Sequence, residues 1–277
     1  MTEIIFFDID GTLRDEELGI PESVTKAFVQ CRERGCKLVI CTGRSMGTIQ
    51  EDVLALGADG YITGGGTRIQ YGNIVIKDTA FSSDKIRSAL DGLIGRAHTG
   101  FTMESQETVF MNGYGARQLI NRNQKIGKQE RGEKIIYQDN IKSLKAGENR
   151  IHKICLWGYE EDYRFLESHL NDEIQLVQSF VWDKCQYYEV VPQGCHKGAA
   201  VWKLCDYLNI PLKHSMSFGD GKNDIEMLSV TGISVAMENG DRELFPYADL
   251  ICREPMKDGI YLALVEAGVI TDDETGK

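Results

Sequence analysis

The chain has 277 residues, of which 42% are hydrophobic and 26% are charged, and its formal net charge at pH 7 is −11. This composition is ordinary for a globular protein with one large domain or two modest ones. Because an acidic surface repels nucleic-acid phosphates and anionic lipids, we expect neither a nucleic acid nor a membrane surface as a partner.

The eight cysteines form no CxxC pair, which argues against a zinc ribbon or a thioredoxin-like motif. The opening MTEIIFFDIDG places acids where a signal peptide would continue its apolar run. No apolar stretch approaches the ~20 residues that span a bilayer. We therefore expect a cytoplasmic protein with reduced cysteines, and its oligomeric state stays open.

The first part of the chain alternates short apolar runs with amphipathic segments. The expected elements are strands over 4–7, 37–41 and 60–63 and helices over 21–34 and 46–56. Runs such as IIFF lack the polar alternation of a half-exposed strand, so they fit a parallel sheet that is covered on both faces. This β-α-β-α-β order predicts a right-handed, doubly wound α/β domain.

The pattern changes between residues 82 and 186. Helix-like stretches over 83–94 and 160–170 mix there with alternating strand-like stretches, as in RIHKICLWGY. After this insert the α/β pattern returns, with helices expected over 198–208 and 224–231 and strands over 215–220, 232–237 and 248–252. We therefore predict one core domain from residues 1–81 and 187–277, interrupted by an α+β insert over 82–186.

Two carboxylates follow the first expected strand. Asp8 and Asp10 lie two residues apart, so they share a face and can reach one site. Ligands of doubly wound sheets bind at the carboxyl ends of strands. Gly11 allows a sharp turn whose amides could approach an anion. The alternative is a plain surface turn, which Asp and Gly also favour.

Two further positions could hold a phosphate. Thr42 and Gly43 follow the second expected strand, where a hydroxyl and backbone N–H groups meet at a helix start. Lys197 opens the helix after the insert and could supply a positive charge. Thr42 could instead cap a helix, and Lys197 could simply be solvated.

A cluster of oxygen ligands follows the strand SMSFGD. It consists of Asp220, Asn223 and Asp224 within GDGKNDIEML, and such ligands suit magnesium. Asp224 could alternatively be a helix N-cap. Because all these groups fall at strand ends or helix starts of one expected sheet, a common site is the better interpretation.

The segments FFDIDGTL, CTGR, CHKG and SFGDGKNDIEML resemble, in this order, the four motifs of the haloacid dehalogenase superfamily. The insert between the second and third motifs resembles the α+β cap (type C2B) of its Cof-type phosphatases. The resemblance implies a mostly parallel, Rossmann-like core with an inserted cap that selects the substrate. Gly64-Gly65-Gly66 stands where that family commonly has Asn-Gly-Ala.

The resemblance also implies roles for the residues of the carboxylate motifs. Asp8 would attack phosphorus and form an aspartyl-phosphate, and Asp10 would act as general acid and base. Mg²⁺ would be held by Asp8, the main-chain carbonyl of Asp10 and Asp220, with Asn223 or Asp224 supporting these ligands from behind.

Further residues would contact the substrate. Thr42, Gly43, Lys197 and Thr12 would hold the transferring phosphoryl group. Arg44 and Arg68 are candidates for contacts beyond the phosphate, with a plain surface strand residue as the alternative for Arg68. Candidates in the insert for contact with a second anionic group are Arg117, Arg122 and Lys125, and the alternative is that these basic residues simply face water.

The function expected from these features is Mg²⁺-dependent hydrolysis of a small phosphorylated metabolite, such as a sugar phosphate, pyridoxal phosphate or flavin mononucleotide. One alternative is a phosphomutase of the same superfamily. Others are a non-catalytic interaction protein and a nucleotide- or flavin-binding module that uses the Gly-rich segment ITGGGTRI.

Overall fold

The structure is a computed structural model that describes residues 2–81, 99–115, 117, 135–137, 150–158, 160–169, 174–182 and 185–272. The expected helix over 83–94, Arg122 and Lys125 lie outside these residues. The chain forms two compact units. The first consists of Met1–Gly43, Ile49–Lys77 and His196–Lys277, and the second of Arg44–Thr48 and Asp78–Cys195.

The boundaries of these units differ from the expected ones at residues 81/82 and 186/187. Strand β11 (Cys185–Pro192) pairs along most of its length with β9 (Lys153–Gly158), so the second unit extends to Cys195. At its start, Asp78 receives hydrogen bonds from Arg150, and this ties it to the second unit.

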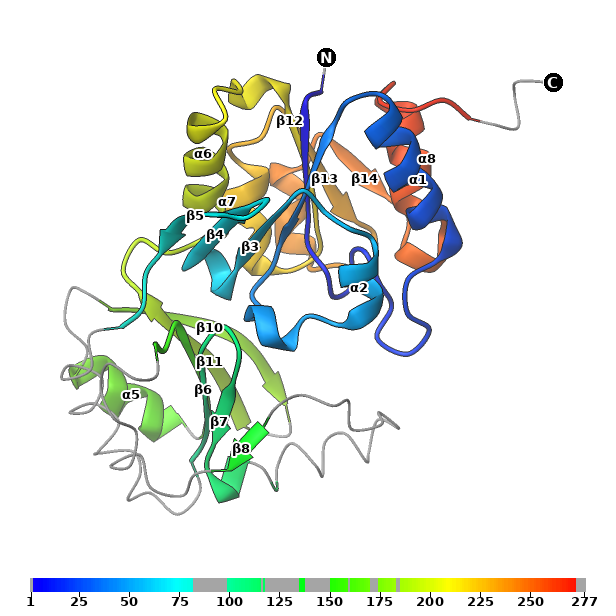
Figure 1. The fold of residues 1–277 in the computed structure, drawn as a ribbon. Coiled ribbons are helices and arrows are strands. Elements are labelled where there is room, and N and C mark those ends of the chain that lie inside the picture. Colours follow the sequence, from blue (N-terminus) through cyan, green and yellow to red (C-terminus); the bar gives the residue numbers. More distant parts are fainter. Residues whose placement is uncertain are drawn as a thin grey trace. The chain divides into compact units, whose positions relative to one another are not determined.

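The first unit is built on an eight-stranded sheet with the order β14-β13-β12-β1-β2-β3-β4-β5 (Figure 1). Its strands are β1 (Ile4–Phe7), β2 (Lys37–Cys41), β3 (Gly60–Thr63), β4 (Arg68–Tyr71), β5 (Ile74–Asp78), β12 (Ser215–Gly219), β13 (Ile233–Met237) and β14 (Leu250–Cys252). The strands from β14 to β3 are parallel, and β4 is antiparallel to β3. The predicted doubly wound, mostly parallel α/β core is confirmed.

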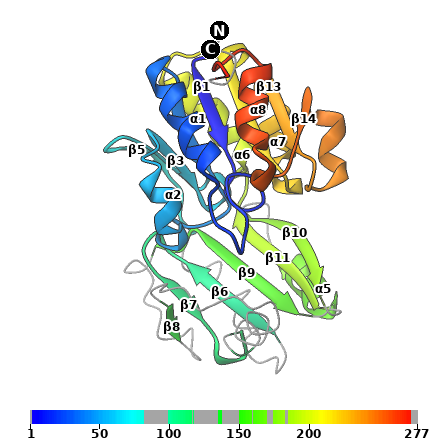
Figure 2. The same cartoon turned by 90° about the vertical axis from the view of Figure 1, so that its right-hand side faces the viewer.

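Helices cover both faces of this sheet. They are α1 (Glu22–Glu33), α2 (Glu51–Ala55), α6 (Lys197–Tyr207), α7 (Ile225–Leu228) and α8 (Gly259–Glu266). Figure 2 shows α1 and α8 side by side over one face, while α6 and α7 pack together over the other. None of the helices within the described residues has the length and apolar character needed to cross a membrane.

Two expected helices are shorter than the sequence indicated. The segment 46–56 forms a 3₁₀ turn (Met46–Thr48) and then α2, because the backbone at Gln50 is extended. Where a helix was expected over 224–231, a 3₁₀ turn (Lys222–Asp224) precedes α7, which ends at Leu228. Further 3₁₀ turns span Gly64–Gly66, Leu212–His214, Arg242–Tyr247 and Pro255–Lys257.

Strand β1 is buried on both faces at the centre of the sheet. On one face, the Phe7 ring lies 4.9 Å from the Phe28 ring and 5.2 Å from the Phe218 ring. On the other face, Ile4 and Phe6 belong to an apolar cluster with side chains of α6. This packing on both sides fixes the carboxyl end of β1, where Asp8 follows.

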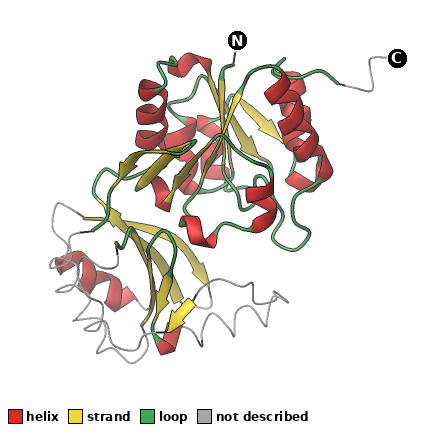
Figure 3. Cartoon of the chain, viewed as in Figure 1, coloured by secondary structure: helices red, strands yellow, loops and turns green. Residues whose placement is uncertain are grey.

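The second unit is the α+β insert, with a six-stranded sheet in the order β10-β11-β9-β6-β7-β8. Its elements are β6 (Gly100–Glu104), β7 (Val109–Met111), β8 (Ile135–Tyr137), β9, α5 (Glu160–His169), β10 (Ile174–Trp182) and β11. All strand pairs are antiparallel except β7 and β8 (Figure 3). One sheet face is apolar and packs against Phe165 of α5.

Candidate active site

Two neighbouring parallel strands, β1 and β12, position the central carboxylates. Phe7 and Phe218 are register partners near the ends of these strands, and Asp8 and Asp220 follow within two residues. From β1 the chain winds to β2 on one side and later returns through β12 on the other. The site therefore lies where the strand order reverses, which is the usual ligand position in doubly wound sheets.

Three carboxylates converge at this point. One oxygen each from Asp8, Asp220 and Asp224 lies within 4.8 Å of the other two. Together with the ammonium of Lys197, which contacts two of these residues, they carry a net charge of −2 when all four are ionised. A divalent cation would neutralise this excess, and a set of carboxylate oxygens is the chemistry that Mg²⁺ prefers. The residues present therefore fit a magnesium ion.

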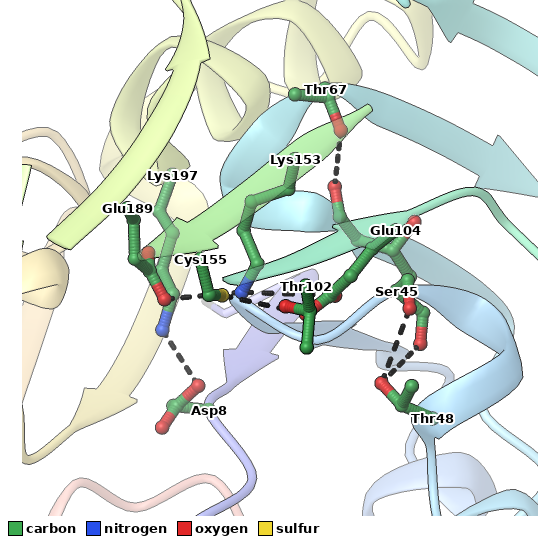
Figure 4. Close-up of polar contacts among 11 residues, drawn as sticks. Asp8, Ser45, Thr48, Thr67, Thr102, Glu104, Lys153, Cys155, Glu189 and Lys197 are labelled. Carbon is green, nitrogen blue, oxygen red and sulfur yellow. Dashed lines mark hydrogen bonds and ion pairs between the residues drawn. The ribbon is translucent and has the colours of Figure 1, made fainter. Parts of the chain in front are cut away.

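Lys197 connects two of the acids. Its Nζ atom donates to Asp8 Oδ1 at 2.6 Å (Figure 4). It also donates to Asp224 Oδ1 at 2.6 Å, and the side chain is buried. Lys197 is the first residue of α6, and His196 caps that helix by accepting the backbone N–H of Ala199. The first residue of α6 thus places the Lys197 ammonium at the carboxyl end of β1.

Asp224 is held firmly by the protein itself. Its Oδ2 atom accepts the backbone N–H groups of Asp220 at 3.1 Å and Gly221 at 3.0 Å, while Oδ1 accepts from Lys197. Both oxygens are therefore engaged. This arrangement suits a residue that orders Asp220 and Lys197 better than one that ligates an ion directly.

The loop after β1 contacts Asp220 from the opposite side. The Thr12 hydroxyl donates to Asp220 Oδ1 at 2.8 Å, so its single proton is directed at the carboxylate and not at the expected phosphate. Gly11 has a φ of +80°, and a Cβ atom there would lie 2.3 Å from Asp220 Oδ2. Only glycine leaves room for this carboxylate.

Burial dominates the acidity of the site. It raises the pKa of Asp220 to about 7, with a further increase from Asp224 and opposing effects from Thr12 and Lys197. Burial also raises the pKa of Asp8, against the opposing charge of Lys197. For Lys197, burial lowers the pKa, but Asp224 and Asp8 outweigh it, so the pKa is raised and the ammonium stays charged.

The remaining predicted residues of the core differ in their burial. Asp10 is half-buried, and its charge contributes to the raised pKa of Asp220. Thr42 is buried, and its backbone groups bond to Ile62 and Gly65 of the neighbouring strand and turn. Gly43 follows it and is half-buried, whereas Asn223 is exposed.

Three of the arginines that were considered for substrate contacts lie within the described residues. Arg44 belongs to the second unit, where its Nη1 atom donates to the Thr48 carbonyl at 3.0 Å. Arg68 donates to Gln70 within β4, and Arg117 is exposed.

Sequence reasoning missed the loop after β13. The Asp220 carbonyl accepts the backbone N–H of Asp241 at 2.7 Å, and a Cβ atom on Gly240 would lie 2.5 Å from that carbonyl. Asn239 donates to the Gly11 carbonyl at 3.1 Å. The sequence signal that could have identified this loop is the position of its ENGD segment (238–241) directly after a core strand.

The Gly-rich segment has a structural role that sequence reasoning did not foresee. Gly64, Gly65 and Gly66 all have positive φ angles, and a Cβ atom on Gly66 would lie 2.5 Å from the His196 carbonyl. The turn packs against the segment that enters α6, and it continues into strand β4. A nucleotide-binding loop would instead open a helix at this point.

Residues 5–264 match the family of haloacid dehalogenase-like hydrolases. The chain belongs to this family, so the resemblance seen in the four motifs and in the Cof-type insert is confirmed. The chain is an enzyme of the phosphatase type within that family.

Individual relatives cover nearly the whole chain. The Bacillus subtilis (strain 168) protein named "Putative phosphatase YkrA" is 27% identical over 269 residues, which is 97% of this chain and 99% of that protein. The structure is similar to that of the subclass IIB sugar phosphatase BT4131, with a TM-score of 0.81, 24% identity, and coverage of 97% of this chain and 100% of the other. It is also similar to that of BT1666 from Bacteroides thetaiotaomicron, with a TM-score of 0.80, 24% identity, and coverage of 98% and 96%.

Proposed function

We propose that this chain is a Mg²⁺-dependent phosphohydrolase that removes phosphate from a small phosphorylated metabolite through an aspartyl-phosphate on Asp8. The observation that carries the proposal is the convergence of Asp8, Asp220, Asp224 and Lys197 at the ends of β1 and β12. Four side chains from three distant segments meet there with an uncompensated negative charge, which is costly without a cation.

Asp8 and Asp220 would hold the ion, together with the main-chain carbonyl of Asp10, and Asp224 would order Asp220 through the backbone. Mg²⁺, when bound, would supply positive charge that offsets the repulsion between a carboxylate nucleophile and a phosphate dianion. Lys197 Nζ lies 2.6 Å from Asp8 Oδ1. Its ammonium can therefore also stabilise the negative charge of the phosphoryl group while that group is transferred.

In the first step, an Asp8 oxygen attacks phosphorus, and the bond from phosphorus to the ester oxygen breaks. Asp10 donates a proton to the departing oxygen. In the second step, Asp10 accepts a proton from water as that water attacks phosphorus. The bond between Asp8 and phosphorus then breaks, and inorganic phosphate leaves. Thr42 and Gly43 would help to hold the phosphoryl oxygens.

The names of similar proteins support a small phosphate ester as substrate. One similar structure belongs to a sugar phosphatase, and the Bacillus relative carries a phosphatase name. We therefore place sugar phosphates first among the candidate substrates, before phosphorylated cofactors such as pyridoxal phosphate and flavin mononucleotide.

A phosphatase screen with Mg²⁺ over a panel of metabolite phosphates tests the proposal. We expect release of inorganic phosphate without formation of an isomeric phosphate, which distinguishes a hydrolase from a phosphomutase. The Asp8→Asn variant should lose turnover by a factor of about 10³ or more. Undiminished hydrolysis by Asp8→Asn would overturn the nucleophile assignment.

A further inference from the structure

The loop after β1 folds tightly around Asp10, the proposed proton donor. The backbone N–H of Arg14 donates to the Ile9 carbonyl at 3.1 Å, and the Arg14 carbonyl accepts the N–H of Gly11 at 3.0 Å. Arg14 is therefore bonded to the residue on each side of Asp10, and Asp10 and Arg14 form an isolated β-bridge. The position of the Asp10 backbone thus depends directly on the position of Arg14.

The side chain of Arg14 connects this loop to helix α2. Its Nε atom donates to Asp52 Oδ2 at 3.2 Å, and Asp52 lies 38 positions further along the chain, in the first turn of α2. The side chain of Arg14 is 3% exposed, whereas that of Asp52 is 39% exposed. Both residues belong to the first unit, so the ion pair is a contact within one compact body.

Packing alone does not explain a buried guanidinium at this position. A charge that has lost nearly all its contact with water carries a large desolvation cost, and a carboxylate that is itself partly exposed offsets only part of it. Apolar residues of similar volume often replace such a pair without loss of stability. A charge-assisted hydrogen bond has a defined direction, however, so it fixes the place of a backbone segment more strictly than an apolar contact does.

The same loop has two further anchors. The Thr12 hydroxyl donates to Asp220, and the Asn239 amide donates to the Gly11 carbonyl. Both contacts bind residues that follow Asp10, and the ion pair adds a third element to which the loop is tied. Groups that transfer protons need this kind of support, because a misplacement of about 1 Å can reduce the rate by a factor of about 10².

Building on the proposed function, we propose that Arg14 is a positioning residue. Through its ion pair with Asp52, it holds Asp10 where this carboxyl group can give a proton to the departing oxygen and later accept one from water. Arg14 acts through the backbone on each side of Asp10. Because assistance by a general acid matters most when the leaving group is poor, Arg14 should matter for alkyl phosphates and little for the first step with an aryl phosphate.

Steady-state kinetics of the full chain with Mg²⁺ test this proposal. The two substrates are 4-nitrophenyl phosphate, which has a good leaving group, and the primary alkyl phosphate of the metabolite panel that the unmodified protein hydrolyses fastest. The variants are Arg14→Met, Arg14→Lys, Asp52→Ala and the double variant of Arg14→Met with Asp52→Ala. Glu51→Ala is the matched control, because Glu51 is an exposed acid in the same first turn of α2.

We expect kcat/KM for the alkyl phosphate to fall about tenfold or more in Arg14→Met and Asp52→Ala. For 4-nitrophenyl phosphate, kcat/KM covers only the steps up to release of the leaving group, so it should stay within about threefold. Its kcat and KM should fall together, since the attack by water still needs Asp10 as a base and the covalent species accumulates.

The remaining variants separate positioning from general loss of structure. Arg14→Lys keeps the cation and should recover most of the loss. The double variant should lose no more than Arg14→Met, because both substitutions break one interaction. Glu51→Ala should match the unmodified protein. Thermal unfolding of each variant sets an assay temperature at which it is folded, and Asp52→Ala and Arg14→Lys provide the test should Arg14→Met fail to fold.

Three results would overturn the proposal. An equal fall in kcat/KM for both substrates would show that the ion pair supports the whole site and not the proton donor. Losses that multiply in the double variant would show that the two residues act separately. Unchanged kinetics in Arg14→Met and Asp52→Ala would show that Asp10 is held without them.

The same assays distinguish failure of this proposal from failure of the proposed function. If Asp10→Asn shows the dependence on the leaving group but the Arg14 and Asp52 variants do not, only the role of Arg14 fails. If the unmodified protein releases no phosphate from either substrate, or if Asp8→Asn is fully active, the proposed function itself fails, and the role of Arg14 fails with it.

Discussion

The hydroxyl of Thr12 donates a hydrogen bond of 2.8 Å to the carboxylate of Asp220, a residue 208 positions away in the sequence. This contact joins the loop after the first strand to the loop after β12, and it sets the orientation of a proposed magnesium ligand. Partners that orient a ligand typically change metal affinity about tenfold or more when they are removed.

We therefore expect Thr12→Val to weaken the activation of turnover by Mg²⁺ about tenfold, because valine keeps the shape but not the proton. A Mg²⁺ titration of phosphatase activity measures this. Thr12→Ser retains the hydroxyl and should restore most of the affinity. Equal Mg²⁺ dependence of the Val and Ser variants would contradict the role assigned to this hydrogen bond.

Gly11→Ala should abolish most activity, because its Cβ atom would lie 2.3 Å from the Asp220 carboxylate. Gly35→Ala is the matched control: Gly35 has a φ of +78°, close to the +80° of Gly11, but no atom lies within 4 Å of the Cβ position. Both substitutions introduce the same left-handed strain, of about 1–2 kcal/mol. Thermal unfolding should show at least this loss of stability in both variants, whereas turnover should fall only in Gly11→Ala.

Removing the buried cation should destabilise the fold when no metal is bound. Lys197 contacts Asp8 and Asp224, so Lys197→Met leaves buried carboxylates without a counter-charge. We expect the free energy of unfolding to fall by about 3–5 kcal/mol in urea denaturation without metal. Added Mg²⁺ should recover part of this loss. Lys203→Met on the exposed side of α6 should change stability by only about 0.5 kcal/mol.

The stabilisation by Mg²⁺ should increase with pH. Burial raises the pKa of Asp220 from 3.8 to about 7, so the metal-free folded protein retains a proton that the unfolded chain releases at lower pH. The protonated Asp220 therefore stabilises the metal-free fold fully below about pH 4, and this stabilisation is lost as the pH rises through 7. Bound Mg²⁺ requires the deprotonated carboxylate, so its effect on Tm grows across the same window.

Thermal unfolding with and without Mg²⁺, at about pH 5.5 and about pH 8, measures this dependence. The increase in Tm should be larger at the higher pH. Asp220→Asn removes one ligand and one titrating group, so it should show a smaller Mg²⁺ effect with a weaker pH dependence. A Mg²⁺ effect that decreases from the lower to the higher pH would contradict the assignment.

Much of the core fold could be predicted from the sequence because its signals are local. Runs such as IIFF and KLVIC are apolar without alternation, and they form the buried strands β1 and β2. The site residues Asp8 and Asp220 directly follow such strands, so the parallel arrangement alone brings them to one edge.

Other features depend on contacts that a local pattern does not encode. The helix expected over 46–56 is interrupted because Gln50 is extended, although its sequence carries no Pro or Gly at that point. The pairing of β11 with β9 moved the insert boundary to Cys195. The contact of Lys153 with Glu189 arises from strand register across β9 and β11, which the sequence does not specify.

The central claim is that Asp8 becomes phosphorylated during turnover. Rapid acid quenching of the Asp10→Asn variant with 4-nitrophenyl phosphate, followed by peptide mass spectrometry, tests it most directly. The good leaving group needs little acid assistance, whereas attack by water still needs the base, so the covalent species should accumulate. We predict one added phosphoryl group on the peptide that contains Asp8, absent when Asp8→Asn is also introduced. Turnover that proceeds without this adduct, or an adduct on another residue, would contradict the account.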